Sequence, residues 1–471
     1  MYGLSRANPD QPPYGHTPSS RNVPVNLRHA RSCLQTLTAA VVLSFTAGAI
    51  AEDWPQWMGT HRDGRWNEEG ILREFPTSGP KFAWKVPVGL GYSGPAVADG
   101  KVFLTDYLRK TGEVKNDPGT RNVLDGQERV RCFDAATGKL VWEHAYDAPY
   151  SISYPSGPRC TPTVDGDRVY ALGAEGKLTC LKAADGKVLW SKDFQKDYGV
   201  TTPIWGFSGH PLVDGDQLIC VVGAKNGLLV SFDKKTGEEK WKALDASEPG
   251  YSSPAMITAG GVRQLIIWTP DEIAALDPAT GKVYWTKPLK PDFAMSIMAP
   301  QKSGDFLFAS GIGNVGALFK LDADKPGASE VWRGTNKTAL YCANATPLIV
   351  DGVIYGCDCN TSQFRAVELA TGKRLWDTFA PTTNDRRSRH GTAFVVKNGD
   401  HYFLMSETGD LIVAKLSAEK YEEISRAQII EPTGDAFGRA VVWSHPAFAK
   451  GHIFARNDKE LVAVDLRRSS N

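Results

Sequence analysis

The 471-residue chain carries 54 Lys and Arg residues against 53 Asp and Glu residues, which gives a formal net charge of +1. This balance provides no global field to recruit nucleic acid or an anionic membrane, so we expect neither as a partner. Hydrophobic residues make up 42% of the chain, which also contains 46 glycines and 13 tryptophans. The composition is typical of a globular β protein with an ample core and many tight turns.

The first 51 residues are predicted to be a targeting segment. A polar stretch is followed by a basic cluster at 28–31, an apolar run over 37–50 and the small-residue triplet Ala49-Ile50-Ala51. This order is typical of a secretory signal peptide, with cleavage after Ala51. The alternative is a retained transmembrane anchor, but the run is interrupted by Thr and Ser and is shorter than the roughly 18 to 20 apolar residues of a span. We therefore expect a periplasmic or secreted protein with no stable membrane anchor.

The cysteines that follow this segment do not form a disulfide framework, because their number is odd and their spacing irregular. They are Cys132, Cys160, Cys180, Cys220, Cys342, Cys357 and Cys359. Only Cys357 and Cys359 lie close together, and in a strand both thiols would point to one face. We interpret Cys357 and Cys359 as two residues of the β-strand core. The alternative is a strained disulfide between them, which can form in an exported protein. No second Cys or His pair stands at a matching distance, so no metal ligands are predicted.

A hairpin motif, D-x-x-T-G-K-x-x-W, recurs along the chain and first appears as Asp134 through Gly138 to Trp142. The Asp can cap the turn, and the Gly accepts the positive φ that a bulged hairpin requires. The Trp lies on the outgoing strand, where it can wedge against a neighbouring unit. Its copies stand 44 to 51 residues apart, the period of a propeller blade, at Trp142, Trp190, Trp241, Trp285, Trp332 and Trp376. A seventh unit, over 414–426, keeps the strand pattern but lacks the Gly and the Trp.

A second motif, a Pro followed by a short apolar strand, an Asp-Gly turn and another strand, precedes the hairpins. Clear copies begin at Pro95, Pro162, Pro211 and Pro347, and looser ones at Pro254, Pro300, Ala393 and Pro446. Eight copies predict an all-β fold, an eight-bladed β-propeller with four-stranded antiparallel blades. The last copy ends without an outer strand, whereas 80–86 resembles an outer strand with no blade before it. The N- and C-terminal strands are therefore predicted to close one blade together.

These repeats resemble the pyrroloquinoline-quinone-type (PQQ-like) repeat of quinoprotein dehydrogenases and of the propeller lipoprotein of the outer-membrane assembly machinery. The resemblance covers about 80–466, and the segment Asp53-Trp54-Pro55-Gln56-Trp57 is similar to the opening of exported bacterial proteins of this class. We expect four parts: a signal peptide with an N-terminal extension over 1–51, a segment packing on the propeller over 52–79, the propeller over 80–466 and a tail over 467–471.

The long entry loops before the inner strands, with an insertion over about 107–129, are predicted to form the working face, opposite the hairpins. Residues just before the inner strands should ring the mouth of the channel. The ligand-binding candidates are Tyr92, Arg159, Trp205, His210, Tyr251, Asn344, Arg389, His390, Trp443 and His445, with Met298 completing the ring. Such a ring suits a small anionic or aromatic ligand, although the same side chains could simply satisfy the blade ends and line water. Arg386, Arg387 and Arg389 fit a solvated basic loop better than an anion site.

Two classes of function remain. The resemblance to quinoprotein dehydrogenases implies a vicinal Cys pair, a calcium held by Glu, Asn and Asp, and a general-base Asp. Asp358 separates Cys357 from Cys359, and the acidic calcium set cannot be located. A binding scaffold needs only a rigid ring with variable loops. We therefore expect a non-catalytic module without a cofactor that recognises a cell-envelope protein or a small-molecule ligand on its loop face. The alternative is a divergent, PQQ- and calcium-dependent alcohol or sugar dehydrogenase.

Overall fold

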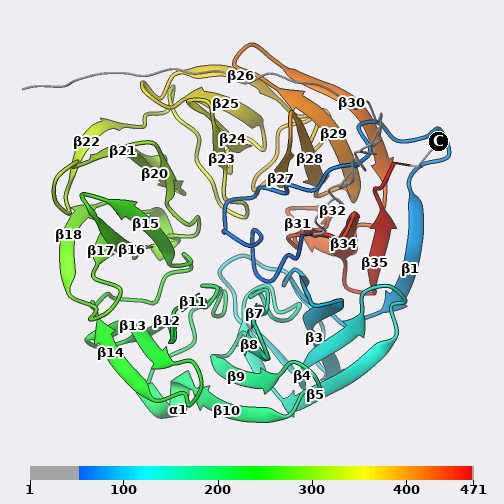
Figure 1. Ribbon diagram of the computed structural model, residues 1–471, viewed down its shortest axis with the longest axis horizontal. Coiled ribbons are helices and arrows are strands. Elements are labelled where there is room, and N and C mark those ends of the chain that lie inside the picture. Colours follow the sequence, from blue (N-terminus) through cyan, green and yellow to red (C-terminus); the bar gives the residue numbers. More distant parts are fainter. Residues whose placement is uncertain (1–51, 469–471) are drawn as a thin grey trace, which may run out of the picture. The chain divides into compact units, whose positions relative to one another are not determined.

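Four-stranded antiparallel sheets arranged in a ring make up nearly all of the computed structural model, which describes residues 52–468. Within these residues there are eight such sheets, each forming a blade that runs outward from the centre (Figure 1). The predicted all-β, eight-bladed propeller is confirmed. The predicted signal peptide lies outside the described residues, and no helix between 52 and 468 is long and apolar enough to cross a membrane.

The first four blades follow one another along the chain, with the innermost strand first in each. Blade 1 has β2 (Ala96–Ala98), β3 (Lys101–Thr111), β4 (Asn122–Asp134) and β5 (Leu140–Asp147), with β6 (Tyr150–Ile152) paired to β4. Blade 2 has β7 (Thr163–Asp165), β8 (Arg168–Leu172), β9 (Lys177–Lys182) and β10 (Val188–Asp193), followed by α1 (Phe194–Tyr198). Blade 3 has β11 (Leu212–Asp214), β12 (Gln217–Ala224), β13 (Gly227–Asp233) and β14 (Glu239–Ala243). Blade 4 has β15 (Ala255–Ala259), β16 (Val262–Trp268), β17 (Glu272–Leu276) and β18 (Val283–Pro288).

The other blades repeat this order, and two short elements lie between them. Blade 5 follows the 3-10 helix η1 (Asp292–Ala294) and has β19 (Gln301–Ser303), β20 (Phe306–Gly311), β21 (Val315–Leu321) and β22 (Ala328–Arg333). Blade 6 has β23 (Leu348–Val350), β24 (Val353–Cys357), β25 (Phe364–Glu368) and β26 (Arg374–Thr378). Blade 7 has β27 (Ala393–Asn398), β28 (His401–Ser406), β29 (Asp410–Leu416) and β30 (Tyr421–Gln428). The hairpin β31 (Gly434–Ala436) and β32 (Arg439–Val441) precedes blade 8, which has β33 (Ala447–Ala449), β34 (His452–Arg456) and β35 (Glu460–Asp465).

Blade 8 is completed by the N-terminal strand β1 (Lys81–Pro87), as the sequence predicted. β1 pairs antiparallel with β35, from Lys81 opposite Asp465 to Pro87 opposite Glu460. Because the first and last strands of the ring share one sheet, no blade edge is left unpaired at the junction of the termini.

Outer-strand tryptophans join neighbouring blades at five of the eight boundaries by covering a hairpin glycine. The indole of Trp142 in blade 1 covers Gly186 in the hairpin of blade 2, where a Cβ would lie only 2.5 Å from the ring. Its Nε1 donates a hydrogen bond to the carbonyl of Ala183 in the same hairpin at 3.0 Å. The same stacking joins Trp84 to Gly138, Trp190 to Gly237, Trp241 to Gly281 and Trp332 to Gly372. The predicted wedge is thus an indole resting on a residue that has no side chain.

The missing tryptophan of the seventh blade is explained by this pairing. Blade 8 has no hairpin between its two outer strands, since they come from opposite ends of the chain. β30 therefore faces no hairpin glycine and needs no tryptophan. Instead, the Oγ of Ser425 in β30 accepts a hydrogen bond from the Phe75 nitrogen at 3.0 Å, and the Phe75 ring is buried.

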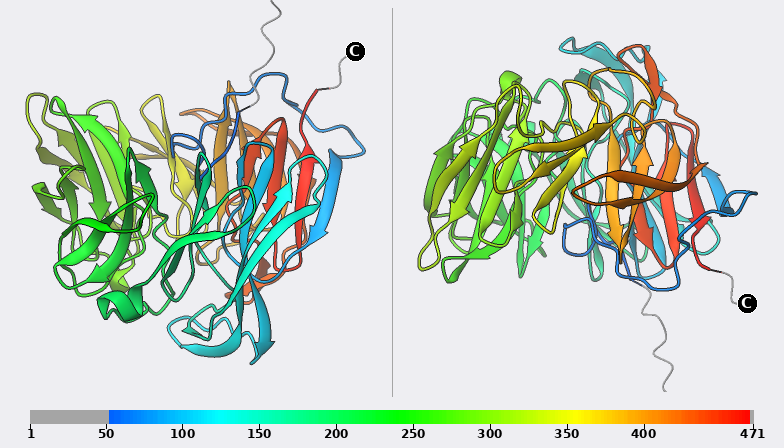
Figure 2. Two further views of the ribbon diagram at one scale, coloured as in Figure 1. Left: turned by 60° about the horizontal axis from the view of Figure 1, so that its bottom comes forward. Right: turned by 90° about the horizontal axis from the view of Figure 1, so that it is seen from above.

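The segment before β1 crosses the centre of the ring, where it is drawn in dark blue in Figure 1. The nitrogens of Trp54 and Val97 each donate to the other residue's carbonyl at 2.8 Å, which ties the segment to blade 1. At blade 7, the Trp66 nitrogen donates to the Lys397 carbonyl at 2.9 Å. Both tryptophans are fully buried, so this segment belongs to the core. In the side view of Figure 2 it occupies one face of the ring, whereas β3, β4 and the β31–β32 hairpin project on the other.

We expect a methyl group at a hairpin glycine to destabilise the ring. Gly186→Ala adds a clash with Trp142, whereas Gly166→Ala, in a turn with nothing within 4 Å, adds only the strain of a positive φ. The strain costs about 1–2 kcal/mol in both variants. Overpacking adds about 1–3 kcal/mol in Gly186→Ala alone. Urea unfolding measures both free energies, and equal losses would contradict the stacking argument.

Candidate functional site

A cavity of about 490 Å³ lies at the centre of the entry-loop face. The entry loops of all eight blades contribute to its wall, because each loop delivers the start of an inner strand to the same point. All ten residues singled out from the sequence line it: Tyr92, Arg159, Trp205, His210, Tyr251, Asn344, Arg389, His390, Trp443 and His445. Met298 does not, since its side chain is buried in blade 5, where Sδ accepts a hydrogen bond from the Ser310 nitrogen at 3.1 Å.

Several lining residues were not anticipated from the sequence. Trp57 comes from the segment that crosses the channel, and Tyr154, Phe293 and Phe437 come from loops outside the repeat register. Trp57 forms the floor, with its ring 4.8 Å from that of His210 and 6.2 Å from that of His445. The central channel is therefore a pocket closed at one end.

A partly buried arginine, Arg62, lies against the loops that carry His210 and Pro254. Arg62 donates hydrogen bonds to the carbonyls of His210, Pro211 and Pro254 and to Oε1 of Gln56. Burial lowers the pKa of Arg62 to about 10, which leaves it protonated at neutral pH. Within residues 52–468 it forms no ion pair, so its charge is balanced only by carbonyl and amide dipoles.

The cavity wall is positive and its histidines are uncharged. Of the described residues that line the cavity, two are Arg and none is Asp or Glu. Burial, with help from Arg62 and His445, lowers the pKa of His210 well below its usual value. Burial also lowers the pKa values of His390 and His445 to about 4. At neutral pH these rings are polar groups without charge, and an anion meets no repelling carboxylate.

The two wall arginines are used differently. Arg159 donates to the carbonyls of Trp205, Gly157, Ser153 and Tyr154, and its guanidinium lies over the Tyr92 ring. It clamps the loops of blade 2 and has few donors left for a ligand. The Arg389 guanidinium is exposed and has no hydrogen-bond or ion-pair partner in the described part of the chain. Of the two, Arg389 is therefore the better placed to bind an anion.

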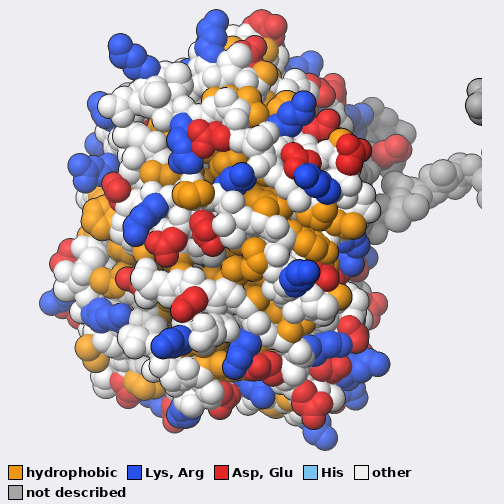
Figure 3. Space-filling view, turned by 90° about the vertical axis from the view of Figure 1, so that its left-hand side faces the viewer, with side chains coloured by type: hydrophobic (Ala, Val, Ile, Leu, Met, Phe, Trp, Pro, Cys, Tyr) orange, Lys and Arg blue, Asp and Glu red, His pale blue; other side chains and the backbone are white. Residues whose placement is uncertain are grey.

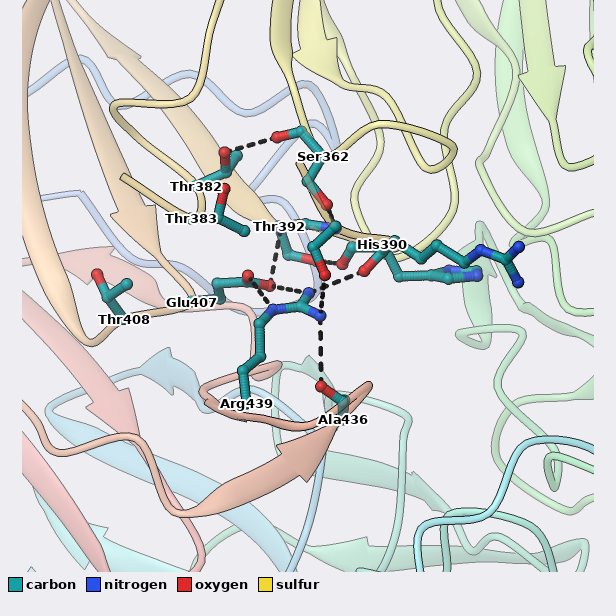
Figure 4. Close-up of polar contacts among 12 residues, drawn as sticks. Ser362, Thr382, Thr383, His390, Thr392, Glu407, Thr408, Ala436 and Arg439 are labelled. Atoms are coloured by element: carbon teal, nitrogen blue, oxygen red, sulfur yellow. Dashed lines mark hydrogen bonds and ion pairs between the residues drawn. The ribbon is translucent and has the colours of Figure 1, made fainter. Parts of the chain in front are cut away.

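A buried ion pair braces the wall beside Arg389 (Figure 4). Arg439, on β32, contacts both carboxylate oxygens of Glu407, from Nε at 2.8 Å and from Nη2 at 3.1 Å. The same guanidinium donates to Oγ of Ser388 and to the Arg389 carbonyl, both at 2.9 Å. Glu407 also accepts from Nε1 of Trp443 at 3.1 Å. This network fixes the position of the Arg389 backbone.

The lining of the cavity contains four residues other than glycine with a positive φ. They are Tyr154 (50°), Phe293 (58°), His390 (55°) and Phe437 (52°). Such backbone is strained for residues with a Cβ and is concentrated at functional sites. The rings of His390 and Phe437 stack at 5.0 Å, whereas Phe293 is 73% exposed. The strained backbone therefore presents aromatic surface at the opening.

The donor set of the cavity does not fit a calcium-bound quinone. Calcium prefers several carboxylate oxygens, and the lining side chains described here supply none. No group of three or more His, Cys, Asp or Glu residues within 52–468 is arranged to hold a metal ion. The seven cysteines of this range are free and buried, and burial raises the pKa of the Cys357 and Cys359 thiols.

Fold and site together define the class, a propeller of PQQ-like repeats with a closed central pocket. The family model described as outer membrane protein assembly factor BamB matches residues 126–292 and 269–471, and the chain belongs to this family. No curated protein matches the sequence.

Solved structures show the same fold at low sequence identity. BamB from Moraxella catarrhalis is 15% identical, with a TM-score of 0.55 over 83% of this chain and 99% of that one. The quinohemoprotein alcohol dehydrogenase from Comamonas testosteroni is 14% identical, with a TM-score of 0.57 over 89% and 81%. A europium-containing methanol dehydrogenase is 12% identical, with a TM-score of 0.58 over 88% and 89%. At these identities the similarity describes the fold alone.

Removing the buried charge of Glu407 should weaken the wall. Glu407→Gln leaves Arg439 without a counter-charge and is expected to cost about 3–5 kcal/mol of unfolding free energy. Glu423→Gln, which removes the more exposed partner of Arg426, should cost under about 1 kcal/mol. The double variant Glu407→Leu, Arg439→Met should recover much of the loss. Similar losses for Glu407→Gln and Glu423→Gln in urea unfolding would contradict this role.

His445 should make the fold sensitive to acid. Its pKa of about 4 in the folded protein is below the usual 6.5, so unfolded chains bind more protons between these values. Its contribution to stability is complete above pH 6.5 and is lost as the pH falls through 4. Between pH 7 and pH 4, His445→Gln should therefore lose about 3 kcal/mol less unfolding free energy than the unaltered protein. His61→Gln, at an exposed position, is the control for urea unfolding at each pH, and an unchanged pH dependence in His445→Gln would refute the assignment.

Proposed function

We propose that this protein is an exported, non-catalytic binding module of the cell envelope that recognises a partner protein on its entry-loop face. In this proposal the central cavity receives an aromatic or anionic side chain of the partner. The protruding strands of blade 1 and the β31–β32 hairpin flank the contact (Figure 2). Membership of a family described as an outer membrane assembly factor supports an envelope partner over a free metabolite.

One observation carries the proposal: a closed pocket walled by aromatic rings, with Arg389 at its mouth and no lining carboxylate. Aromatic walls offer large contact areas, and an unpaired guanidinium offers charge-assisted hydrogen bonds. The exposed, strained Phe293 adds an apolar anchor beside the opening. The lining histidines are poor proton acceptors at neutral pH, because His390 and His445 have pKa values of about 4 and the pKa of His210 is also lowered.

The outer side of the ring offers a contrasting surface. Around β18 and β22, hydrophobic side chains lie among Lys, Arg, Asp and Glu (Figure 3). Val283 and Val331 are exposed there at 40% and 44%. Because these side chains are small and dispersed, this surface serves as an internal control for the loop face.

Site-specific crosslinking in cells tests the proposal. A photo-crosslinking phenylalanine analogue at Phe293 should trap one discrete envelope protein, whereas the same analogue at Val283 should not. Adding Arg389→Glu should reduce the Phe293 adduct at least about tenfold, because a like charge replaces the anion contact. Equal trapping at both positions, or an adduct unaffected by Arg389→Glu, would overturn the proposal.

A quinone titration tests the alternative enzyme. Adding pyrroloquinoline quinone with Ca²⁺ should produce neither alcohol or sugar oxidation nor a saturable rise in Tm. Saturable binding together with turnover would replace the binding module by a divergent quinoprotein.

A further inference from the structure

A buried carboxylate holds the first described residue. The backbone nitrogen of Glu52 lies 3.0 Å from Oε1 of Glu68. Glu68 is only 7% exposed, and its Oε2 accepts a hydrogen bond from the Gly451 nitrogen at 2.7 Å. Both carboxylate oxygens are thus used on backbone nitrogens, one at the N-terminal end of the described chain and one in the closing blade.

This carboxylate has no side-chain cation as a partner in the part of the chain that the structure describes. Two basic residues near this carboxylate pair with other acidic residues: Lys450 lies 2.8 Å from Asp53 and Arg467 lies 2.6 Å from Asp465. A buried carboxylate without a counter-ion costs free energy unless a positive charge reaches it.

The neighbouring contacts align Glu52 on this carboxylate. Its carbonyl accepts from the Lys450 nitrogen at 3.2 Å, and its own Oε2 accepts from the Asn67 nitrogen at 2.9 Å. The Nδ2 of Asn398 holds the Glu68 carbonyl at 2.8 Å. Lys450 and Gly451 form the turn between β33 and β34, in the blade that both chain ends complete.

We propose that Glu68 is the receptor for a new N-terminus created by cleavage between Ala51 and Glu52. Hydrolysis of this peptide bond leaves a carboxylate on Ala51 and an ammonium group on Glu52, with water supplying the oxygen and the protons. The nitrogen that donates as an amide before cleavage then carries the charge that Glu68 lacks. This inference rests on the proposed export and cleavage after Ala51, and it is independent of what the central cavity binds.

The charge pair would exist only after processing. Removal of the signal peptide would therefore strengthen the attachment of the 52–68 segment to blade 8. Because this segment also provides Trp57 at the cavity floor, processing would stabilise the floor and the ring together.

The first experiment identifies the N-terminus. The full chain is exported from cells with its own leader, and the purified product is analysed by intact mass and N-terminal sequencing. A product that begins at Glu52 supports the proposal. A product that begins elsewhere overturns it and leaves the crosslinking result at Phe293 unaffected.

The second experiment is a double-mutant cycle on the melting temperature. Glu68 and Glu68→Gln are compared in the processed protein and in a form that retains Ala49-Ile50-Ala51 behind an initiating Met. Glu68→Gln should lower Tm by about 2–4 °C in the processed form, because it removes a charged hydrogen-bond partner. In the extended form it should lower Tm by less, because Gln still accepts from the uncharged Glu52 amide and only the hydrogen bond from the Gly451 nitrogen is lost. Glu69→Gln, at an exposed neighbouring position, should have no effect in either form. Equal effects of Glu68→Gln in both forms overturn the proposal.

A third measurement does not depend on stability. Pairing with Glu68 raises the pKa of the Glu52 α-ammonium group, so a smaller fraction of it is the neutral, reactive amine. Each unit of rise in this pKa lowers that fraction tenfold. Labelling of the Glu52 α-amine by an amine-reactive reagent at pH 7, followed by peptide mass spectrometry, should be about tenfold slower in the unaltered protein than in Glu68→Gln. Equal labelling rates overturn the proposal.

Discussion

The contact between an indole and a hairpin glycine is the interaction on which this ring depends. At five blade boundaries an outer-strand tryptophan reaches across to a hairpin glycine, as Trp142 does to Gly186, and a Cβ on the glycine would crowd the ring. The contact carries both dispersion and a hydrogen bond from Nε1 to a hairpin carbonyl. Because these contacts lie on the hairpin side of the blades, side chains of the entry loops on the other side are available for function.

The break in this pattern is a consequence of how the ring closes. A blade built from both chain ends has no hairpin, hence no glycine for the preceding tryptophan to cover. The chain fills that junction with Phe75, and the same N-terminal segment continues through the centre of the ring. Closure of the ring and closure of the pocket floor are therefore performed by one segment, with Trp57 and Trp66 buried or half-buried along it.

Features that follow the repeat motif were predictable from the sequence, whereas residues outside the motif were missed. Blade number, the pairing of β1 with β35 and the cavity residues were predictable, because each inner strand begins at a fixed place in the motif. Trp57 was missed because its segment lies outside the repeats. Phe293 was missed because its loop occurs in one blade only. Met298 has the correct register, but its flexible side chain packs inward on Ser310. Whether a side chain already has partners, as Arg159 has, depends on loop conformation that no local pattern encodes.

The electrostatics of the pocket follow from its closed floor. An open, water-filled channel would hydrate Arg62 and the histidines, but burial leaves Arg62 charged among carbonyl dipoles and holds His210 and His445 neutral. A group entering the pocket thus meets positive charge without mobile protons to exchange. Binding an anion there satisfies Arg389 and partly offsets the field of Arg62, whereas proton transfer would require a base that titrates near neutral pH. The pocket is therefore better suited to binding an anion than to proton transfer, and this is the physical reason that the loop face is proposed as a docking site.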